Sequence, residues 1–513
     1  MKKFVSKLLS RLVLTGLIIL AQILWIGYTL YAASEINPFF EMGLHIIAVI
    51  CALYVVYKDI RPNNKLSWVF LILFLPIIGV PCYFLFGRSD MTKSSRERMS
   101  EIINCVAPLR ESAEEVETHL EGISLVAKKQ MAYAKNIGRY PVYMEKDTNY
   151  YKSGEEMFPD MLEDLRKAKK FIFVEFFIMR PGKMFDSIVE ILEQKAKEGV
   201  HVRLIYDDMG CMDNLPPRYY KVLQGKGIHC ASFNPVRPFL SIIMNNRDHR
   251  KILVIDGEIA YTGGVNLADE YINEIERFGY WKDAALRITG DAVWTFTSMF
   301  LEMWNFITKN NEDYSRYKIA TNENAKLIEE KKGFVQPYGD CPLDRKCVGE
   351  AVYLNMINNA TKYIYIFTPY LIVGAELTTA LINAARSGVD VRIVTPGIPD
   401  KRMVYLVTQA NYEQLIRGGI KIYQYTPGFI HSKCFVVDDE YAAVGTVNMD
   451  FRSLTLHFEC GVFMYRTACI EQVKKDALQT FETSRQISLE ECENKNFFFQ
   501  LFLSVLRLFA PLL

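Results

Sequence analysis

The chemical feature that stands out in the sequence is a short pattern of histidine, lysine and asparagine that occurs twice. The first copy, HRKILVIDGEIAYTGGVN, runs from His249 to Asn266, and the second, HSKCFVVDDEYAAVGTVN, runs from His431 to Asn448. In both copies a lysine follows the histidine by two residues and an aspartate follows that lysine by five. The offset between the copies is 182 residues throughout. A single pattern of this kind is weak evidence, but two copies in a chain with seven histidines indicate a duplicated site.

The residue types suit chemistry at a phosphate group. Histidine can act as a nucleophile or exchange a proton, lysine supplies positive charge, and the asparagine amide donates hydrogen bonds to oxygen. Small glycines allow the backbone to approach an oxyanion. We therefore expect phosphate oxygens to be held by Lys251, Lys433, Asn266 and Asn448.

Each copy predicts a β-hairpin that brings these residues together. Residues 252–255 and 434–437 are short apolar runs bounded by turn residues, which is typical of buried strands. Because alternate residues of a strand point to the same face, the histidine and the lysine should project together. If the chain folds back after the run, Asn266 lands beside His249.

The aspartate of each copy stands at the expected turn. Asp256 is followed by Gly257, which is a strong hairpin signal, and Asp438 is followed by Asp439, which is a weaker one at the same place. We interpret Asp256 and Asp438 first as structural supports of the hairpin.

The doubled pattern resembles the paired HKD motifs of the phospholipase D superfamily, over roughly residues 130–490. The resemblance implies a two-step exchange at a phosphodiester that needs no metal and no cofactor. One motif histidine would attack phosphorus and form a phosphohistidine, while the other protonates the leaving alcohol and then deprotonates the acceptor. By the same resemblance His249 is the nucleophile, although the residues themselves leave this choice open. The catalytic set that the family implies is His249, Lys251, Asp256, His431, Lys433 and Asp438.

Two acidic residues follow the motifs, Asp283 in GYWKDAAL and Glu459 in LHFECGVF. In the family, an acidic residue in this position holds the far nitrogen of a motif histidine, which fixes the tautomer and stabilises the imidazolium. We expect Asp283 to serve His249 and Glu459 to serve His431. The alternative is that both are surface carboxylates. His457 is interpreted as a structural strand residue, and Thr446, where the first copy has a glycine, is treated as a minor departure.

A larger internal repeat surrounds the motifs. Residues 168–178 match residues 360–370, and residues 197–210 match residues 386–399. Strands alternate with helices in each half, which favours an α/β sandwich for each. We predict an α/β fold of two similar phospholipase D-like halves packed face to face, with both motifs in one cleft, preceded by an α-helical transmembrane module.

The amino-terminal region carries three apolar runs, residues 12–33, 42–57 and 66–86. The first is long enough to span a bilayer, and the third contains Pro76, which predicts a kink or a re-entrant segment. We expect two spans with a re-entrant third run, because this arrangement keeps every basic loop, and the catalytic region, in the cytoplasm, whereas three spans would place that region outside. Residues 65–88 resemble the amino-terminal membrane module of bacterial cardiolipin synthases.

Composition limits the remaining possibilities. The chain has 60 Lys and Arg residues and 59 Asp and Glu residues, so its charge is nearly balanced. This argues against a nucleic-acid-binding protein, which usually carries a basic face. Eleven scattered cysteines without C-x-x-C pairs favour a reducing compartment over a zinc site or a disulfide framework. The apolar carboxyl end, residues 497–513, predicts either an interfacial helix or one that packs on the domain.

The expected domain organisation follows from these features. It comprises a membrane module (1–90), a charged helical linker (91–130), a first half (131–330), a second half (331–495) and a C-terminal interfacial helix (496–513). The sequence leaves the oligomeric state open.

The function that the resemblance implies is that of a multi-pass cell-membrane phosphatidyltransferase, similar to bacterial cardiolipin synthases, that converts two phosphatidylglycerol molecules into cardiolipin and glycerol. Three alternatives remain: a membrane phospholipase D hydrolase, a transferase with another lipid donor or acceptor, and a non-enzymatic membrane scaffold.

Overall fold

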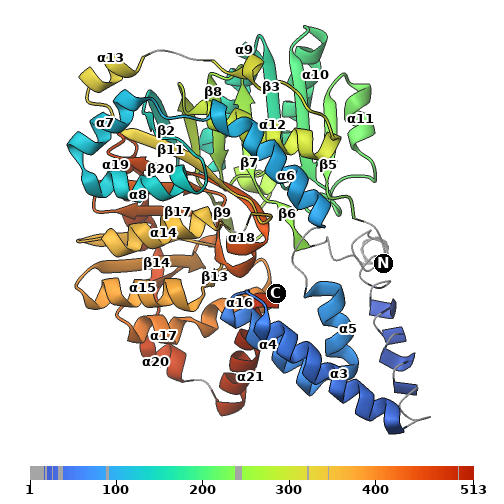
Figure 1. The fold of residues 1–513 in the computed structure, drawn as a ribbon. Helices are drawn as coiled ribbons and strands as arrows, with labels where there is room; N and C mark the ends of the chain where they lie inside the picture. The colour runs from blue at the N-terminus through green and yellow to red at the C-terminus, as the bar shows by residue number, and fades with distance from the viewer. Residues whose placement is uncertain are drawn as a thin grey trace.

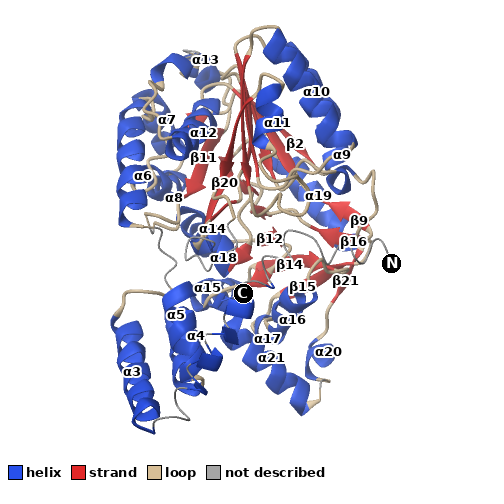
Figure 2. Cartoon of the chain, turned by 90° about the vertical axis from the view of Figure 1, so that its right-hand side faces the viewer, coloured by secondary structure: helices blue, strands red, loops and turns tan. Residues whose placement is uncertain are grey.

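The computed structural model describes residues 38–87, 92–236, 245–319, 323–344, 346–494 and 496–512, with isolated residues between 17 and 32. The first apolar run of the sequence lies largely outside these residues. In the described part, two β-sheets with flanking helices form the body, and the amino-terminal helices and the carboxyl-terminal helix extend below it (Figures 1 and 2).

The first sheet holds the first motif and has seven strands. Their order is β2-β10-β8-β7-β3-β4-β5. Strands β3, β4 and β5 run parallel, while β7, β8, β10 and β2 continue the sheet in antiparallel fashion. The bounds are β2 Asp147–Tyr151, β3 Phe171–Phe176, β4 His201–Asp207, β5 His229–Phe233, β7 Lys251–Ile255, β8 Ile259–Gly263 and β10 Ala285–Thr289.

The second sheet repeats this order. It runs β11-β20-β18-β17-β12-β14-β15, with β1 added at one edge and β21 at the other. The two internal repeats predicted from the sequence therefore occupy equivalent positions, and the two-half α/β fold is confirmed. The bounds are β1 Tyr143–Met144, β11 Phe334–Asp340, β12 Tyr363–Phe367, β14 Asp390–Pro396, β15 Lys421–Tyr425, β17 Cys434–Val437, β18 Tyr441–Gly445, β20 His457–Tyr465 and β21 Ser484–Gln486.

The two sheets share one hydrophobic core. Strands β8 and β10 of the first contact β18 and β20 of the second. Helix α12, Val293–Thr308, is almost entirely buried and touches strands of both sheets. Its Phe300 stacks on Phe173 of β3 with ring centres 4.5 Å apart. Apolar residues on all sides of this helix are explained by its position between the halves.

The remaining helices of the halves lie around the two sheets (Figures 1 and 2). In the first half they are α9 Gly154–Lys167, α10 Lys183–Lys197 and α11 Tyr220–Gly225, with the short helices η3 Asp269–Ile272 and η4 Ser315–Tyr317. In the second half they are α14 Val348–Asn359, α15 Ala375–Arg386, α16 Arg402–Ala410, α17 Tyr412–Arg417, α18 Phe451–Thr455, α19 Ile470–Glu482 and α20 Leu489–Glu493.

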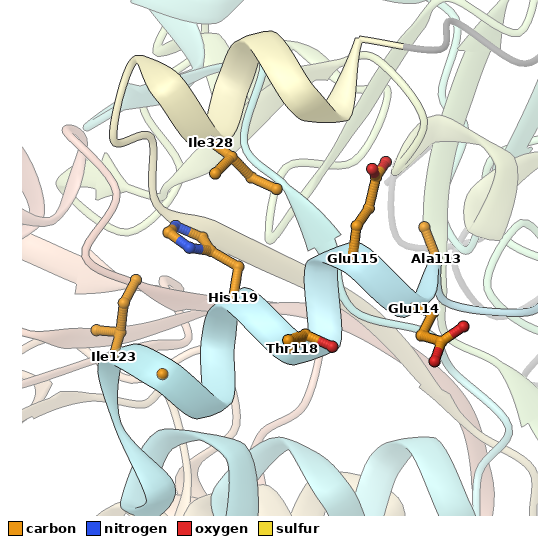
Figure 3. Close-up of a pocket in the computed structure, with 8 residues that line it drawn as sticks. Ala113, Glu114, Glu115, Thr118, His119, Ile123 and Ile328 are labelled. Carbon is orange, nitrogen blue, oxygen red and sulfur yellow. The ribbon is translucent and has the colours of Figure 1, made fainter.

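Short strands and a helical segment complete the body. The strands are β6 Arg247–Asp248, β9 Tyr280–Lys282, β13 Leu371–Ile372, β16 Gly428–Ile430 and β19 Met449–Asp450. The segment before the first half contains α6 Lys93–Val106, η1 Ala107–Leu109, α7 Glu114–Ile123 and α8 Leu125–Asn136. Helix α7 and helix α13, Asn324–Glu329, flank a surface pocket lined by residues such as His119 and Ile328, which contains no motif residue (Figure 3).

The amino-terminal helices account for the second and third apolar runs. Helix α3, Pro38–Tyr57, covers the second run, and the third forms two helices, α4 Pro62–Phe74 and α5 Pro76–Phe86. The break predicted at Pro76 is confirmed, because proline lacks the N–H that would continue α4. Measured by length and apolar character together, none of the helices described here is sufficient for a bilayer crossing.

The amino-terminal helices are tied to both the second half and the carboxyl end. Arg61, between α3 and α4, forms an ion pair with Glu350 at the start of α14. The carboxyl-terminal helix α21, Phe497–Phe509, continues into η5, Ala510–Leu512. Ser67 of α4 donates a hydrogen bond to the Leu508 carbonyl at 2.6 Å.

Candidate active site

Both predicted hairpins are present. In the first, β7 pairs with β8 so that Leu253 faces Tyr261, and in the second, β17 pairs with β18 so that Cys434 faces Val444. The return strands bring the glycine–asparagine ends of the motifs back to the histidines, as the sequence predicts.

The two motifs meet in one cavity of about 550 Å³ between the halves. His249, Asn266, His431 and Asn448 all line it. The rest of its wall mixes aromatic and charged residues, among them Tyr271, Phe278, Trp281, Arg247, Lys401 and Arg452. A cavity with histidines from both halves can bind one phosphodiester between them.

Each motif histidine is held by an acid of the opposite half. Nδ1 of His249 lies 2.9 Å from Oε2 of Glu459, and Nδ1 of His431 lies 2.7 Å from Oδ2 of Asp283. The expected pairing, Asp283 with His249 and Glu459 with His431, is therefore wrong. With Nδ1 engaged by the acid, Nε2 of each histidine remains for chemistry at phosphorus.

Strand pairing across the halves is the physical reason for this exchange. Strand β6, which leads into His249, pairs in parallel with the start of β20, which leads to Glu459. Strand β16, which leads into His431, pairs in the same way with β9, which leads to Asp283. The His249 N–H donates to the Phe458 carbonyl at 2.9 Å, and the His431 N–H donates to the Lys282 carbonyl at 2.7 Å.

The two acids have different surroundings, which explains why the motifs differ at one position. Glu459 accepts hydrogen bonds from the hydroxyls of Thr446 and Ser453, the latter at 2.5 Å. A Cβ on Gly264, the counterpart of Thr446, would lie 1.9 Å from Oδ1 of Asp283. Glycine is thus required beside Asp283, whereas threonine supports Glu459. The sequence analysis treated Thr446 as a minor departure and did not identify Ser453, because only the crossed fold brings Glu459 between them.

The motif lysines lie beneath the histidines rather than on the cavity wall. Nζ of Lys251 donates to the His249 carbonyl at 2.6 Å, and Nζ of Lys433 donates to the His431 carbonyl. Both side chains are about 1% exposed. Burial lowers the pKa of Lys251 to about 8 and that of Lys433 to about 7, despite the nearby carboxylates. Below these values the lysines place positive charge under the site.

The surroundings of both motif histidines lower the pKa of the imidazole and so favour its neutral form. Burial, followed by the charges of Lys251 and Lys433, holds the pKa of His249 well below its usual range. Burial and the charge of Lys433 lower the pKa of His431 to about 4, although Asp283 opposes this shift. A neutral imidazole is the form that can attack phosphorus, and a bound phosphate anion would raise both pKa values again.

The two motif asparagines are not equivalent. The amide of Asn266 is engaged within its own half, since Oδ1 accepts from the Ile178 N–H at 3.0 Å and Nδ2 donates to the Tyr271 hydroxyl at 2.9 Å. Oδ1 of Asn448 is buried and lacks a hydrogen-bond partner among the described residues. Both line the cavity, and their contact with a phosphate stays a prediction.

The motif aspartates point away from the cavity. Asp256 accepts hydrogen bonds from the N–H groups of Lys169, Lys170 and Phe171, at 2.6–2.9 Å. Asp438 accepts equivalent bonds from residues 361–363, and both aspartates adopt left-handed backbone at their turns (φ 55° and 54°). They join the hairpin to the start of the neighbouring strand. We therefore assign them the structural role, in place of membership in the catalytic set.

An arginine of the first motif was overlooked in the sequence. Arg250, between the motif histidine and lysine, is buried and forms ion pairs with Glu175 of β3 at 2.6 Å and with Asp248 at 3.1 Å. The available signal was the run of charged residues at 247, 248, 250 and 251 directly before a buried strand, since buried charges in proteins are normally paired.

Comparison with known proteins places this site in a family. The family described as "Cardiolipin synthase, PLD-like domain" matches residues 161–304 and 353–481. The chain belongs to this phospholipase D-like cardiolipin synthase family. A second family, described as "Phospholipase_D-nuclease N-terminal", matches residues 46–88.

Relatives of the family align with nearly the whole chain. A cardiolipin synthase of Alkalihalophilus pseudofirmus is 33% identical over 94% of this chain and 95% of its own length. One from Halalkalibacterium halodurans is 32% identical over the full length of both. The crystal structure of phosphatidylserine synthase from Haemophilus influenzae aligns with a TM-score of 0.57 at 17% identity, covering 75% of this chain and all of that one. This last likeness concerns the fold.

One group of site residues has the types and spacing of a metal site. Ligand atoms of His249, His457 and Glu459 lie within 4.8 Å of one another. However, the Glu459 oxygens already accept bonds from His249, Thr446 and Ser453. A cation here would have to displace these donors beside two buried lysines, so the residues fit a metal-free site better.

Proposed function

We propose that this family member catalyses phosphatidyl transfer between two phosphatidylglycerol molecules, which gives cardiolipin and glycerol. The observation that carries the proposal is the pair of acid-supported histidines that face one cavity. Relatives named cardiolipin synthase that match over nearly the whole chain support the choice of substrate.

The reaction would proceed in two steps. Nε2 of His249 attacks phosphorus, the bond from phosphorus to the glycerol oxygen breaks, and His431 gives its proton to that oxygen. A hydroxyl of the second phosphatidylglycerol then loses its proton to His431 and attacks phosphorus, which releases His249. Glu459 stabilises positive charge on His249, and Asp283 does so for His431. The lysine charges stabilise the pentacoordinate phosphate in a water-poor cavity.

We also propose that the amino-terminal helices attach the protein to the cell membrane. Large apolar side chains of α3 and α4, such as Phe39, Leu53, Tyr57 and Phe74, are exposed, which suits contact with lipid. We propose in addition that the protein crosses the membrane more than once and that its catalytic body lies in the cytoplasm. We propose no nucleic-acid partner.

The decisive experiment is reconstitution of the purified protein with phosphatidylglycerol, followed by thin-layer chromatography. Cardiolipin and an equal amount of glycerol should form. Phosphatidic acid without cardiolipin would instead indicate a hydrolase, in which water takes the place of the second lipid. Products formed only after addition of another alcohol or lipid would indicate a different acceptor.

A further inference from the structure

The carboxyl-terminal helix α21 turns its apolar side chains away from the protein. Five residues, Phe497, Phe498, Leu501, Phe502 and Val505, are 44–80% exposed. Their spacing places them on one face of the helix, because residues three or four apart lie above one another. This face therefore has no cover within the described chain.

The face of α21 that lies against the catalytic body is apolar as well, since Leu503 is buried and Leu506 packs against buried apolar residues, while the polar side chains lie along the edge of this contact. Gln500, Ser504 and Arg507 line a hollow shared with α16, α17 and α20, and Arg507 donates to Oε1 of Gln414 on α17 at 2.5 Å. Because one apolar face of α21 already packs on the body, the second leaves large apolar side chains exposed, which the hydrophobic effect disfavours in water. A helix with a second, outward apolar face is stable where its outer surroundings are apolar.

The end of the same segment reaches the active site. Ala510, directly after α21, lines the catalytic cavity. Ala510 packs in a small apolar cluster with Ile372, Val407 and Phe451. Val404 and Leu506 pack against this cluster. An apolar strip thus leads from the cavity, along Val404, Phe451 and Ala510, to the base of α21.

The segment also contacts the amino-terminal helices. Phe509 meets Phe70 of α4 edge to face at 5.9 Å. Both views show α21 and helices α3–α5 at the same lower end of the molecule (Figures 1 and 2). The exposed face of α21 is therefore continuous with the region that we propose to be membrane-attached.

We propose that α21 lies in the surface of the bilayer, and that the strip Val404, Phe451 and Ala510 guides the acyl chains of a bound lipid from the membrane to the cavity. The ligand is a phospholipid that enters sideways, with its phosphate at the histidines and its chains against this strip. The acyl-chain path rests on the proposed function, while the position of α21 in the bilayer does not.

Photocrosslinking tests the position of α21. Benzoylphenylalanine replaces Phe502, on the outer face, in the full-length protein in vesicles of phosphatidylglycerol and phosphatidylcholine. The matched control carries the same group at Leu478, which is 39% exposed on α19. We expect adducts with lipid at position 502 and at least fivefold fewer at position 478. Equal yields, no lipid adduct at 502, or a crosslink between two copies of the chain would overturn the proposal.

Chain-length dependence tests the acyl path. Ala510→Phe should lower kcat/KM for dioleoyl phosphatidylglycerol at least tenfold, and that for soluble dihexanoyl phosphatidylglycerol less than twofold. Val505→Phe, on the outer face, is the control and should change neither. Val404→Phe repeats the test if Ala510→Phe fails to fold. An equal loss on both lipids, or no loss, would refute the path. Absence of transfer by the wild type with either lipid would instead refute the proposed function.

Discussion

At the scale of single residues, the proposed chemistry depends on two histidines with separate tasks. His249→Ala and His431→Ala should each lower transfer between phosphatidylglycerol molecules by about a hundredfold or more, because nucleophile and proton carrier are not interchangeable. Initial rates with the reconstituted proteins check this, and thermal unfolding curves should match those of the wild type. Near-normal turnover in either variant would contradict the two-histidine mechanism.

The pH dependence follows from the lowered pKa values of His431 and Lys433. His431, with a pKa of about 4, loses the proton that it gives to the leaving alcohol as pH rises, and Lys433 loses its charge at about 7. Both losses weaken catalysis, so kcat/KM should fall from pH 5 to pH 9. The fall in kcat should come at higher pH, because the bound phosphate raises both values.

A substrate with a better leaving group separates the contribution of the His431 proton from that of the Lys433 charge. With phosphatidyl-p-nitrophenol the proton from His431 matters little, and only the fall near pH 7 should remain. In Lys433→Arg, whose guanidinium keeps its charge, that fall should move toward pH 8, where Lys251 titrates. Rates that rise between pH 6 and pH 8 would show that this electrostatic account is wrong.

At the scale of elements, the crossed pairing of β6 with β20 and of β16 with β9 determines which acid serves which histidine. In a His431→Ala protein assayed with phosphatidyl-p-nitrophenol, Glu459→Gln should slow release of p-nitrophenol by about tenfold or more, because it removes the partner of His249. Asp283→Asn should slow this release much less, because His431, the partner of Asp283, is already replaced by alanine. The opposite ranking would indicate acids that act within their own halves.

The hairpin aspartates belong to the same scale. Asp438→Ala should lower the free energy of unfolding by about 2–4 kcal/mol, because the N–H groups of residues 361–363 lose a buried carboxylate. Turnover per folded molecule should remain close to that of the wild type. Urea denaturation measures the first quantity, and Glu440→Ala at the same turn is the control. A large loss of turnover without loss of stability would restore Asp438 to the catalytic set.

At the scale of the whole molecule, one chain supplies both halves of the site. The two sheets share a core and exchange strand contacts, so each chain should be self-sufficient. Mixing the His249→Ala and His431→Ala proteins in one vesicle preparation should therefore restore no transfer. Recovery of about a quarter or more of the wild-type rate would show that halves are exchanged between chains.

The sequence by itself determined the hairpins, the repeat and the types of residue at the site. These features are local: a short apolar run at residues 252–255, turn residues at Asp256 and Asp438, and a repeated spacing from histidine to asparagine. The break at Pro76 was also predictable, because proline lacks the N–H that would continue the preceding helix.

Only the tertiary structure decided how the halves share the site. Which acid faces which histidine depends on parallel pairing between strands that are 210 residues apart in one case (Arg247 and His457) and 148 in the other (Tyr280 and Gly428), and no local pattern encodes that pairing. The role of Thr446 depends on the same contact, since its hydroxyl is useful only because Glu459 lies beside it. The outward apolar face of α21 was likewise undecided, because the sequence pattern gives an amphipathic helix but not the side on which the protein lies. Long-range packing fixes such relations, since each is a property of two surfaces rather than of one segment.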